Sequence, residues 1–336
     1  MVVNYKDMKT IQDPSAKFIK KKTLFLSIII PHYNGAHYLL PCFKALRCQT
    51  YPHLEVILVD NGSTDESVAL TRRDFPEVKV VELGKNYGLT GAINRGIQHA
   101  CGQIIVSLNN DTEVTPGWAQ ALVDALEEYP DAGMAASKML LFDERDRIHS
   151  AGDGFGTNGI PINRGVWEKD KGQFDHDTYI FGGCGGAVAY RREMLDKIGL
   201  FDEELFMYLE DVDLNWRAQL AGYRVVFAPQ AVVYHHLSAS GGGFIASYYT
   251  GRNTIFMLAK VLPGFIFRRY WWPILKAQLT IAVEALRAWQ GEAARARLQG
   301  QLAGIWGLPR WLAKRRTVQR SEQVSDTYLE SLLTKV

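Results

Sequence analysis

Three carboxylates crowd into four positions at Glu210, Asp211 and Asp213, in the segment that reads Tyr-Leu-Glu-Asp-Val-Asp-Leu from position 208. The pattern predicts a helix over 210–221, and the helix dipole stabilises anions in its first turn. Three carboxylates in one turn also repel each other, which raises the pKa of at least one of them. Such a group suits general-base catalysis at neutral pH. The alternative is a solvated acidic helix end.

A second candidate is Asn109-Asn110-Asp111, which directly follows an apolar run at 104–108. An aspartate beside amide oxygens suits Mg²⁺ or Mn²⁺ held together with substrate phosphates. The alternative is that Asp111 and Thr112 cap a helix beginning near Pro116. His235 and His236 follow the apolar stretch 225–234. A neutral imidazole ligates metals readily, but this spacing is no zinc signature and a structural pair is the alternative.

Further candidates lie in polar or glycine-rich loops. Asp60, which follows the run at 54–59, could accept a hydrogen bond from a nucleotide base, or it could serve only as a turn residue. The glycines at 182–186 interrupted by Cys184 could let backbone approach a substrate, or form a tight turn between strands. Trp167 could stack on a substrate ring or pack into the core, and Asp153, Glu168 and Asp175 are further candidates for contacts with a substrate.

These residues need a scaffold, and the alternation of patterns predicts one. Short apolar runs at 27–30, 54–59, 78–83 and 104–108 alternate with helix-period segments at 37–49, 65–74 and 89–100. This alternation predicts a parallel sheet wrapped by helices, with ligands at the carboxyl ends of its strands. Ser63 and Thr64 are predicted to cap the second helix. Later segments predict loops or short hairpins at 150–177, helices at 191–198 and 210–221, a strand at 224–228 and helices after 248.

The ordered motifs identify a family. They are Ile-Ile-Pro-His-Tyr-Asn-Gly (29–35), Val-Asp-Asn-Gly-Ser-Thr-Asp (59–65), Asn-Tyr-Gly-Leu-Thr-Gly-Ala-Ile-Asn-Arg-Gly (86–96), Asn-Asn-Asp (109–111), Arg-Arg (191–192), Gly-Leu-Phe-Asp-Glu (199–203), Tyr-Leu-Glu-Asp-Val-Asp-Leu (208–214) and His235. Together they resemble glycosyltransferase family two over nearly the whole chain. The region from 165 onward, with Arg252-Asn253 and Lys314-Arg315-Arg316, is most similar to its rhamnosyltransferase-like branch.

The resemblance implies an α/β GT-A fold, which is a Rossmann-like, mostly parallel sheet wrapped by helices, here with a C-terminal helical annex. It implies an extension at 1–22, a catalytic domain at 23–247 with a nucleotide-sugar half (about 23–115) and an acceptor half (about 116–247), and a helical region at 248–336. The implied nucleotide-binding residues, with Asp60 on the base, are Pro31, Tyr33, Asn34, Asp60, Asn86, Gly91, Asn94 and Asn110.

The same resemblance implies that Asp211 is the catalytic base of an inverting sugar transfer. Mg²⁺ or Mn²⁺ would be held by Asp111, His235 and Asn109, where Asn109 replaces the first aspartate of the family's DxD motif and is a weaker ligand. Acceptor-side residues would be Gly185, Gly186, Trp167, Glu210 and Asp213. The expected donor is dTDP-rhamnose, with UDP-hexoses or UDP-N-acetylhexosamines as alternatives, and the expected acceptor is a glycan or lipid-linked glycan of a bacterial cell-surface polysaccharide.

Two other function classes are alternatives to a glycosyltransferase. A nucleotidyltransferase also combines a nucleotide fold with carboxylate-bound metal, but this chain lacks a Gly-rich, Lys-containing phosphate loop near its N-terminus. A non-catalytic carbohydrate-binding protein is favoured only by Asn109. The nucleotide that is released distinguishes the three classes.

The net charge of +2, from 38 Lys and Arg against 36 Asp and Glu in 336 residues, argues against a dedicated nucleic-acid binder. That balance conceals two regions. Positions 260–320 hold twelve basic and two acidic residues, a net charge of +10, which leaves −8 for the remainder, and they also hold five of the eight Trp. Basic residues interleaved with aromatic ones suit an anionic membrane surface. A helical annex packed on the protein or a partner subunit is the alternative, and a homo-oligomer is left open.

Targeting signals point to the cytoplasm. The four Cys form no CxxC pair, 1–22 has no apolar core of a secretory signal, and the apolar stretches after 261 are broken by Arg and Lys. We therefore expect a cytoplasmic protein, peripheral on the inner face of the cell membrane if the basic region binds lipid.

Overall fold

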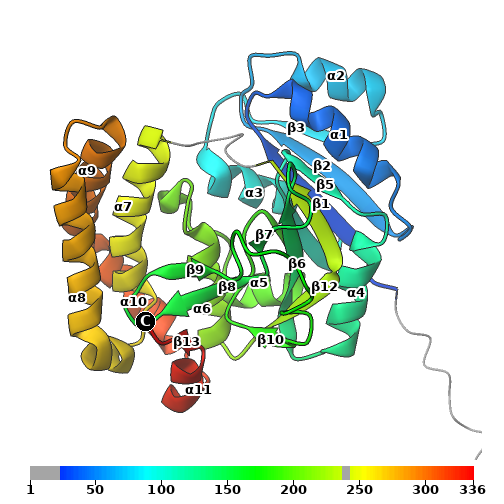
Figure 1. Ribbon diagram of the computed structural model, residues 1–336. Coiled ribbons are helices and arrows are strands. Elements are labelled where there is room, and N and C mark those ends of the chain that lie inside the picture. The colour runs from blue at the N-terminus through cyan, green and yellow to red at the C-terminus, as the bar shows by residue number, and fades with distance from the viewer. Residues whose placement is uncertain (1–22, 237–242) are drawn as a thin grey trace, which may run out of the picture.

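The computed structural model describes residues 23–236 and 243–336, so the predicted extension at 1–22 lies outside the described residues (Figure 1). The strands of the main sheet are β1 (Leu26–His32), β2 (Leu54–Asp60), β3 (Lys79–Glu82), β4 (Ile104–Leu108), β5 (Thr112–Val114), β6 (Ala132–Leu141), β7 (Ile148–Ser150), β10 (Tyr179–Ile180), β11 (Ala187–Arg191) and β12 (Arg224–His235). The helices of the same part of the chain are α1 (Ala36–Arg47), α2 (Ser67–Asp74), α3 (Gly88–His99), α4 (Trp118–Glu128), α5 (Arg192–Ile198) and α6 (Glu210–Leu220), with a 3₁₀ turn, η1, at Glu203–Leu205.

The ten strands form one sheet in which β10, β12, β6, β11, β4, β1, β2 and β3 lie side by side in that order, with β5 on β12 and β7 on β6. The four strands β3, β2, β1 and β4 are all parallel, as the alternation of apolar runs and helix periods predicted. β1 is buried along its whole length, which explains its uninterrupted apolar sequence. The carboxyl ends of these strands therefore meet along one edge, where ligands bind in sheets of this kind.

The capping roles predicted at two helix starts are wrong. Helix α2 begins at Ser67 rather than Asp65, and the side chain that accepts from its first N–H is Asp65, so Ser63 and Thr64 do not have that role. Instead Ser63 Oγ accepts from the backbone N–H of Asn34. Asp111 and Thr112 cap no helix either, because β5 begins at Thr112 and α4 begins only at Trp118. Asp111 is thus free of the capping role that was the alternative to metal binding.

The region at 150–177 forms short hairpins, as predicted. Strands β8 (Asp153–Gly156) and β9 (Pro161–Asn163) pair antiparallel, and β13 (Leu333–Thr334) adds a third, parallel strand to β8. This small sheet joins two segments of the chain that are about 180 residues apart in sequence, and β13 had no counterpart in the sequence-based prediction. It fixes the strand that begins at Asp153.

The C-terminal region is helical, as predicted, with α7 (Gly243–Lys260), α8 (Gly264–Arg287), α9 (Glu292–Trp306), α10 (Leu308–Arg320) and α11 (Asp326–Ser331). In Figure 1 the helices α7, α8 and α9 stand together beside the part of the chain that holds the sheet. One apolar cluster contains Trp216 and Phe181 together with Met257, Ile266 and Val318 from this region. The C-terminal helices therefore share a core with the catalytic half, so we propose that the boundary near 248 separates two parts of one folded unit.

Candidate active site

A pocket of about 840 Å³ opens at the carboxyl ends of β1 and β4. Its wall combines the loops after these strands with the first turns of α3 and α7. The lining residues are Pro31, His32, Tyr33, Asn34, Gly35, His37, Tyr38, Asn61, Asn86, Gly88, Leu89, Asn109, Asn110, Phe206, Met207, Phe244, Ile245, Tyr248, Tyr249 and Gln299. Five of the residues predicted to bind the nucleotide are thus brought together: Pro31, Tyr33, Asn34, Asn86 and Asn110. The pocket has the size range of ligand sites in general.

His32 belongs to the first motif but had no role predicted from sequence, and it lines the pocket. Asn110 Nδ2 donates to His32 Nδ1 over 2.7 Å, so Nε2 carries the proton and donates to Ser67 Oγ over 2.6 Å. The Ser67 hydroxyl in turn donates to Asp65, which also accepts from the backbone N–H groups of Gly35 and Ala36. Burial lowers the pKa of His32, so this imidazole is neutral and the chain of hydrogen bonds has one direction.

Three residues predicted to contact the nucleotide lie outside the lining of this pocket. Asp60 accepts from the N–H groups of Gly62 and Ser63, which is the turn role that was its alternative. Asn94 is buried, donates to the Phe201 carbonyl and accepts from the Phe201 N–H. Gly91 lies in α3, where an added Cβ would come within 2.7 Å of the Tyr87 side chain. Neither Asp60, Asn94 nor Gly91 lines the pocket, so a contact of Asp60 with the base stays a proposal.

Beside the pocket, Asp111 and His235 face each other across neighbouring strands. His235 Nε2 and Asp111 Oδ1 are 3.2 Å apart, and neither atom has a hydrogen-bond partner although both are buried. On its other side, His235 Nδ1 lies 3.2 Å from Nδ1 of His149. Burial lowers the pKa of His149 to about 4, with His235 contributing, so this second imidazole is neutral at physiological pH. His149 was missed from sequence because nothing near position 149 resembles a ligand motif.

The Asp111–His235 pair fits a divalent cation. Two ligands of an octahedral ion such as Mg²⁺, each about 2.1 Å from it, lie about 3 Å apart. Two buried, unpartnered ligand atoms at 3.2 Å match that separation. Imidazole and carboxylate oxygen are both ligands of Mn²⁺, whereas imidazole is less usual for Mg²⁺. Asn109, the third predicted ligand, lines the pocket.

Asp211 lies in the first turn of α6, with the glycine-rich stretch at 182–186 packed against it. Its Oδ2 accepts from the Gly185 N–H and its Oδ1 from the Val212 N–H, both over 2.8 Å. A Cβ at Gly185 would approach Asp211 Oδ2 to 3.1 Å, so glycine is needed there for close approach of the backbone. Gly186, the next residue, lies beside Asn109: a Cβ at Gly186 would be 3.4 Å from Asn109 Nδ2. The glycine-rich stretch thus contacts both Asp211 and a predicted metal ligand.

Two more buried carboxyl groups, Glu210 and Asp153, lie near Asp211. Burial raises the pKa of all three, and the charge of Asp211 raises the pKa of the other two further. Backbone hydrogen bonds lower the pKa of both Asp211 and Glu210 in part. Asp211 differs because its charge raises the pKa of Glu210 to about 8 and that of Asp153 well above its ordinary value, whereas neither group raises the pKa of Asp211, so Asp211 ionises first. Of the three, Asp211 is therefore the carboxyl group best suited to accept a proton.

Glu210→Gln is expected to stabilise the protein at alkaline pH. The raised pKa of Glu210 means that the folded state holds a proton that the unfolded state loses, so stability falls as the pH rises from about 4.5 to about 8. The amide removes this loss, and each kcal/mol corresponds to about 2–4 °C in Tm for chains of 150–250 residues. Thermal melts should show a gain of a few degrees at pH 9 and little change at pH 5. An equal shift at both pH values would contradict the assignment.

The loop before α6 is strained and held from outside. Phe206, Tyr208 and Leu209 have φ angles of 66°, 66° and 64°, which side-chain-bearing residues rarely adopt. The fully buried Asn253 of α7 places its amide nitrogen within 3.0 Å of the carbonyl oxygens of Leu205, Met207 and Tyr208. The strain, of order 1–3 kcal/mol per residue, therefore persists because α7 determines the loop conformation.

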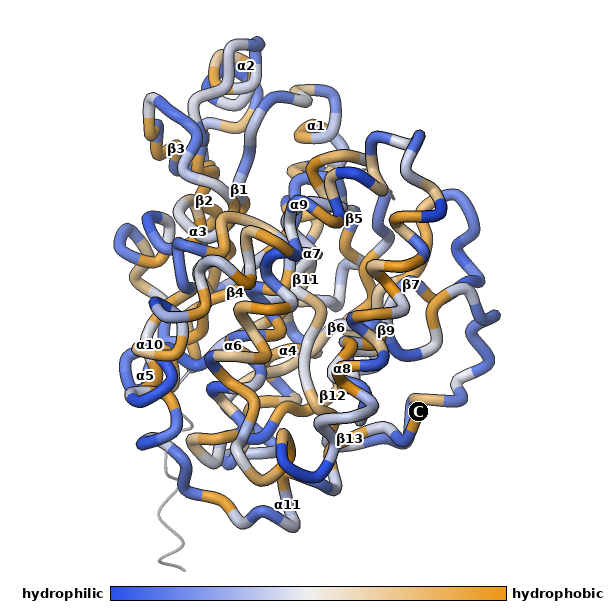
Figure 2. The backbone as a smooth tube through the Cα atoms, turned by 90° about the vertical axis from the view of Figure 1, so that its left-hand side faces the viewer, coloured by the Kyte–Doolittle hydropathy of each residue, from blue (hydrophilic) through white to orange (hydrophobic). Residues whose placement is uncertain are grey.

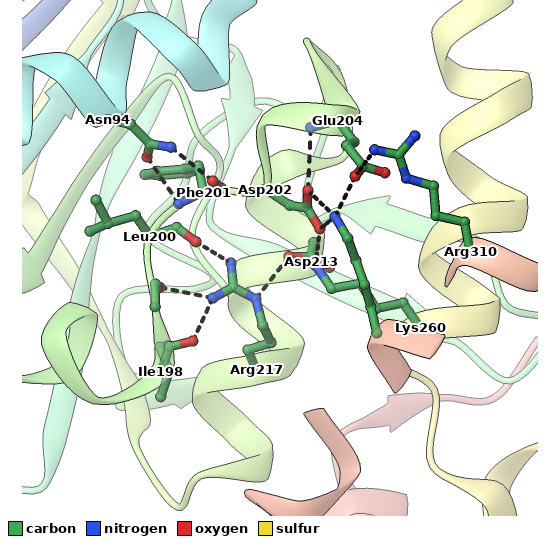
Figure 3. Close-up of polar contacts among 12 residues, drawn as sticks. Asn94, Ile198, Leu200, Phe201, Asp202, Glu204, Asp213, Arg217, Lys260 and Arg310 are labelled. Carbon is green, nitrogen blue, oxygen red and sulfur yellow. Dashed lines mark hydrogen bonds and ion pairs between the residues drawn. The ribbon is translucent and has the colours of Figure 1, made fainter. Parts of the chain in front are cut away.

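A buried ion network secures the other side of α6 (Figure 3). Lys260 Nζ lies 2.8 Å from both Asp202 and Asp213, and Asp213 Oδ2 also accepts from Arg217 Nε over 2.8 Å. Lys314 from α10 pairs with Asp202 over 2.7 Å. Burial opposes ionisation of Asp202, but Lys260 and Lys314 overcome it and lower its pKa to about 2. The network thus links α6 to α7 and α10 through charges that depend on one another.

Two residues predicted to contact the acceptor do not line the pocket. Asp213 is fully buried in the ion network described above, so it holds α6 in place and presents nothing to a substrate. Trp167 is 56% exposed and has a φ of 69°, so the alternative prediction that it packs into the core is wrong. It does not line the pocket either. Glu210 and Gly185 do lie beside Asp211. Spacing alone could not separate Glu210 from Asp213, because both fall in the same turn of the helix.

Comparison with known proteins agrees with this geometry. The model of the family described as "Glycosyl transferase family 2" matches residues 27–199. An N-acetylglucosaminyl-diphospho-decaprenol L-rhamnosyltransferase of Mycobacterium tuberculosis is 28% identical over 276 residues, which cover 74% of this chain and 86% of that protein.

Two solved structures share the fold. GalNAc-T7 with UDP, GalNAc and Mn²⁺ superposes with a TM-score of 0.58 and 20% identity, covering 71% of this chain but only 48% of that one. The mannosyltransferase PcManGT of Pyrobaculum calidifontis, in complex with GDP-Man and Mn²⁺, has a TM-score of 0.53 and 19% identity, covering 90% of this chain and 86% of that one. At these identities the likeness concerns the fold alone.

Proposed function

Because the chain belongs to glycosyltransferase family 2 and is a glycosyltransferase of the GT-A fold, we propose that it transfers rhamnose from dTDP-rhamnose to a hydroxyl of a lipid-linked glycan, with inversion. The observation that carries the proposal is the pair of buried, unpartnered ligand atoms on Asp111 and His235 beside a pocket for a nucleotide. The rhamnosyltransferase relative supports this donor and acceptor, since its name specifies rhamnose and a diphospho-decaprenol carrier. UDP-hexoses and UDP-N-acetylhexosamines are the alternative donors.

In this mechanism Asp211 removes the proton from the acceptor hydroxyl. The resulting oxygen attacks the anomeric carbon of the donor from the face opposite the diphosphate. The new glycosidic bond forms as the bond from that carbon to the diphosphate oxygen breaks, and the electron pair leaves with the nucleoside diphosphate. Asp211 suits the role because it is the first of the three carboxyl groups to ionise and is held by the Gly185 and Val212 N–H groups.

A divalent cation fits the site beside the pocket. Asp111 and His235, together with Asn109, would hold it, and it would neutralise the charge that builds on the diphosphate. The neutral His149 would keep His235 oriented toward Asp111 through its Nδ1 contact, as partners of ligating histidines commonly do.

An assay of the purified protein tests both the reaction and the donor. The protein is incubated with dTDP-rhamnose, UDP-glucose, UDP-N-acetylglucosamine or GDP-mannose, with Mn²⁺ or Mg²⁺ and a lipid diphosphate-linked N-acetylglucosamine. We expect release of dTDP and a product heavier by one deoxyhexose in mass spectrometry. Pyrophosphate release would indicate a nucleotidyltransferase, and absence of any turnover would favour a binding protein.

Asp111→Asn tests the metal site. In the presence of dTDP, Mn²⁺ should raise the Tm of the unaltered protein, and this increase should be absent in the variant.

We further propose that the C-terminal helices bind an anionic membrane surface, which would bring the enzyme to a lipid-linked acceptor. Along α8 a stripe of apolar side chains at intervals of three or four residues is about half exposed: Phe267, Trp271, Leu275, Leu279, Val283 and Leu286. Trp306 at the end of α9 is 90% exposed. Figure 2 looks at the side of the molecule that these helices form, and hydrophobic segments appear along them.

The charge of these helices supports lipid as the partner. Arg268, Lys276 and Arg287 lie on α8 among the exposed apolar side chains, in the region whose net charge is +10. Amphipathic helices with this composition lie in the plane of an anionic membrane surface. No helix in the described part of the chain is both long and apolar enough to span a bilayer.

Replacing Trp271 and Trp272 by Ser is expected to lower cosedimentation with vesicles of 30% phosphatidylglycerol and 70% phosphatidylcholine at least tenfold. The two indoles are 51% and 55% exposed, and interfacial binding scales with buried apolar area. Binding of the unaltered protein should also weaken at high salt. The control is Trp167→Ser, which removes an equally exposed indole at 56% from another part of the fold. If the protein instead formed a dimer without lipid, and the double substitution dissociated that dimer, the exposed apolar face of α8 would be a contact with a second copy of the chain.

A further inference from the structure

Asp153 is a buried carboxyl group to which the proposed mechanism gives no task. It begins β8, and its backbone pairs with Gly182, which anchors it next to the glycine-rich stretch that contacts Asp211. Only 4% of the residue is exposed. Its Oδ1 has no hydrogen-bond partner, although buried polar atoms are nearly always paired. An unpaired oxygen of this kind calls for a partner that the protein itself does not supply.

The position of this carboxyl group relative to the base is the second observation. A carboxylate oxygen of Asp153, a carboxylate oxygen of Asp211 and the sulfur of Cys184 all lie within 4.8 Å of one another. An oxygen that makes two hydrogen bonds of about 2.7 Å in tetrahedral directions holds its partners about 4.4 Å apart. One hydroxyl group can therefore bridge carboxylate oxygens of Asp153 and Asp211 within this limit.

The charges around Asp153 decide how it would bind such a group. Burial raises its pKa well above the ordinary value, and the charges of Asp211 and Glu210 raise it further, while Ser150 and Arg164 oppose the shift. The Cys184 thiol is also neutral, because burial and the same carboxyl groups raise its pKa. Next to an ionised Asp211, Asp153 is thus the carboxylic acid form, which can donate a hydrogen bond.

We propose that Asp153 positions the acceptor: its carboxylic acid donates a hydrogen bond to the acceptor oxygen whose proton Asp211 removes. The hydroxyl group then has one direction for its proton, toward Asp211, and its remaining lone pair is free to face the anomeric carbon. Orientation of this kind lowers the barrier by fixing the reacting geometry before the reaction. This role rests on the proposed function, since it presumes that Asp211 is the base.

Initial-rate kinetics on three variants of the full chain test the role. Asp153→Leu keeps the approximate size but removes the donor, so the acceptor KM should rise at least tenfold and kcat should fall, while the donor KM stays within twofold. Asp153→Asn retains an N–H donor and should recover most of the loss. Asp146→Asn is the control, because Asp146 is 61% exposed and pairs only with the exposed Lys169. If Asp153→Leu does not fold, as judged by thermal melting, Asp153→Ala takes its place in the same comparison.

Two results would overturn the proposal: an acceptor KM of the Leu or Ala variant within twofold of the unaltered protein, or an equal defect in the Asn variant. A parallel rise in donor and acceptor KM would show a merely structural role and would overturn it too. Failure of the proposed function looks different, since the unaltered protein would then transfer no sugar, or Asp211→Asn would remain fully active.

Discussion

Asp211→Asn is expected to lower kcat by about 10²–10⁴, the usual cost of losing a general base. The amide is nearly the same size, but its one oxygen can accept from only one of the Gly185 and Val212 N–H groups. Thermal melting therefore checks that the variant folds, and the donor affinity should not change. What disappears is the first of the three neighbouring carboxyl groups to ionise. Single-turnover measurement of nucleoside diphosphate release, with Kd for the donor measured by titration, separates the two effects.

The matched comparison is Glu210→Gln, which changes the adjacent residue by the same chemistry. Because Glu210 keeps its proton up to a pKa of about 8, its replacement by a neutral amide should cost far less activity at pH 7. If the Gln variant lost as much as the Asn variant, or if Asp211→Asn kept more than a tenth of its activity, the assignment of the base would be incorrect.

Lys260→Met is expected to destabilise the fold by roughly 3 kcal/mol. The substitution keeps most of the side-chain volume but removes the ammonium group that lies 2.8 Å from both Asp202 and Asp213. Removing one partner of a buried ion pair typically costs about 3–5 kcal/mol, because the other charge is left in a medium of low polarity. The lower end applies here because Lys314 and Arg217 still neutralise the two carboxylates in part. Denaturant unfolding at pH 7 measures the difference.

The pH dependence of the Lys260→Met effect provides a check. The pKa of Asp202 is lowered to about 2 by Lys260 and Lys314, against the effect of burial. A carboxylate with a lowered pKa contributes stability above its ordinary pKa of about 4, and this stability is lost as the pH falls toward 2. The difference between the two proteins should therefore be full at pH 7 and shrink below about pH 4. A constant difference would assign it to packing.

The control for this substitution is Lys169→Met. Lys169 and Asp146 form an ion pair of 2.8 Å whose side chains are about 60% exposed, so water and salt screen the interaction. We expect a change below about 1 kcal/mol. A cost similar to that of Lys260→Met would mean that the loss of any lysine, rather than burial of the partners, explains the effect.

The parallel half of the sheet and the pocket at its edge could be predicted from sequence because each depends on local patterns. The buried run of β1 and the polar residues that follow it stand next to one another in the chain, so Tyr33 and Asn34 were placed correctly. Helix starts were harder, because a residue with capping chemistry can serve a neighbouring element. Asp65 illustrates this: it precedes α2 and accepts from its first N–H, at Ser67, but it also accepts from the N–H groups of Gly35 and Ala36 at the start of α1.

The rest of the site depends on contacts between segments far apart in sequence. His149 meets His235 across 86 positions, and Asn253 reaches back to the carbonyl oxygens of the 205–208 loop. No periodicity in one segment contains such information. Asp213 was assigned to the acceptor for the same reason, since only the position of Lys260 in another helix reveals that this carboxylate faces inward.

The hold of Asn253 on the loop before Asp211 bears on how such enzymes can be recombined. A chimera that joined the sheet of this chain to the C-terminal helices of another transferase would replace the residue that maintains three unfavourable φ angles. The graft would then alter the catalytic turn even if every residue of 23–236 were retained. Exchange of acceptor preference between relatives therefore requires moving α7 together with the segment 205–211 as one cassette, rather than cutting the chain at the point where its composition changes.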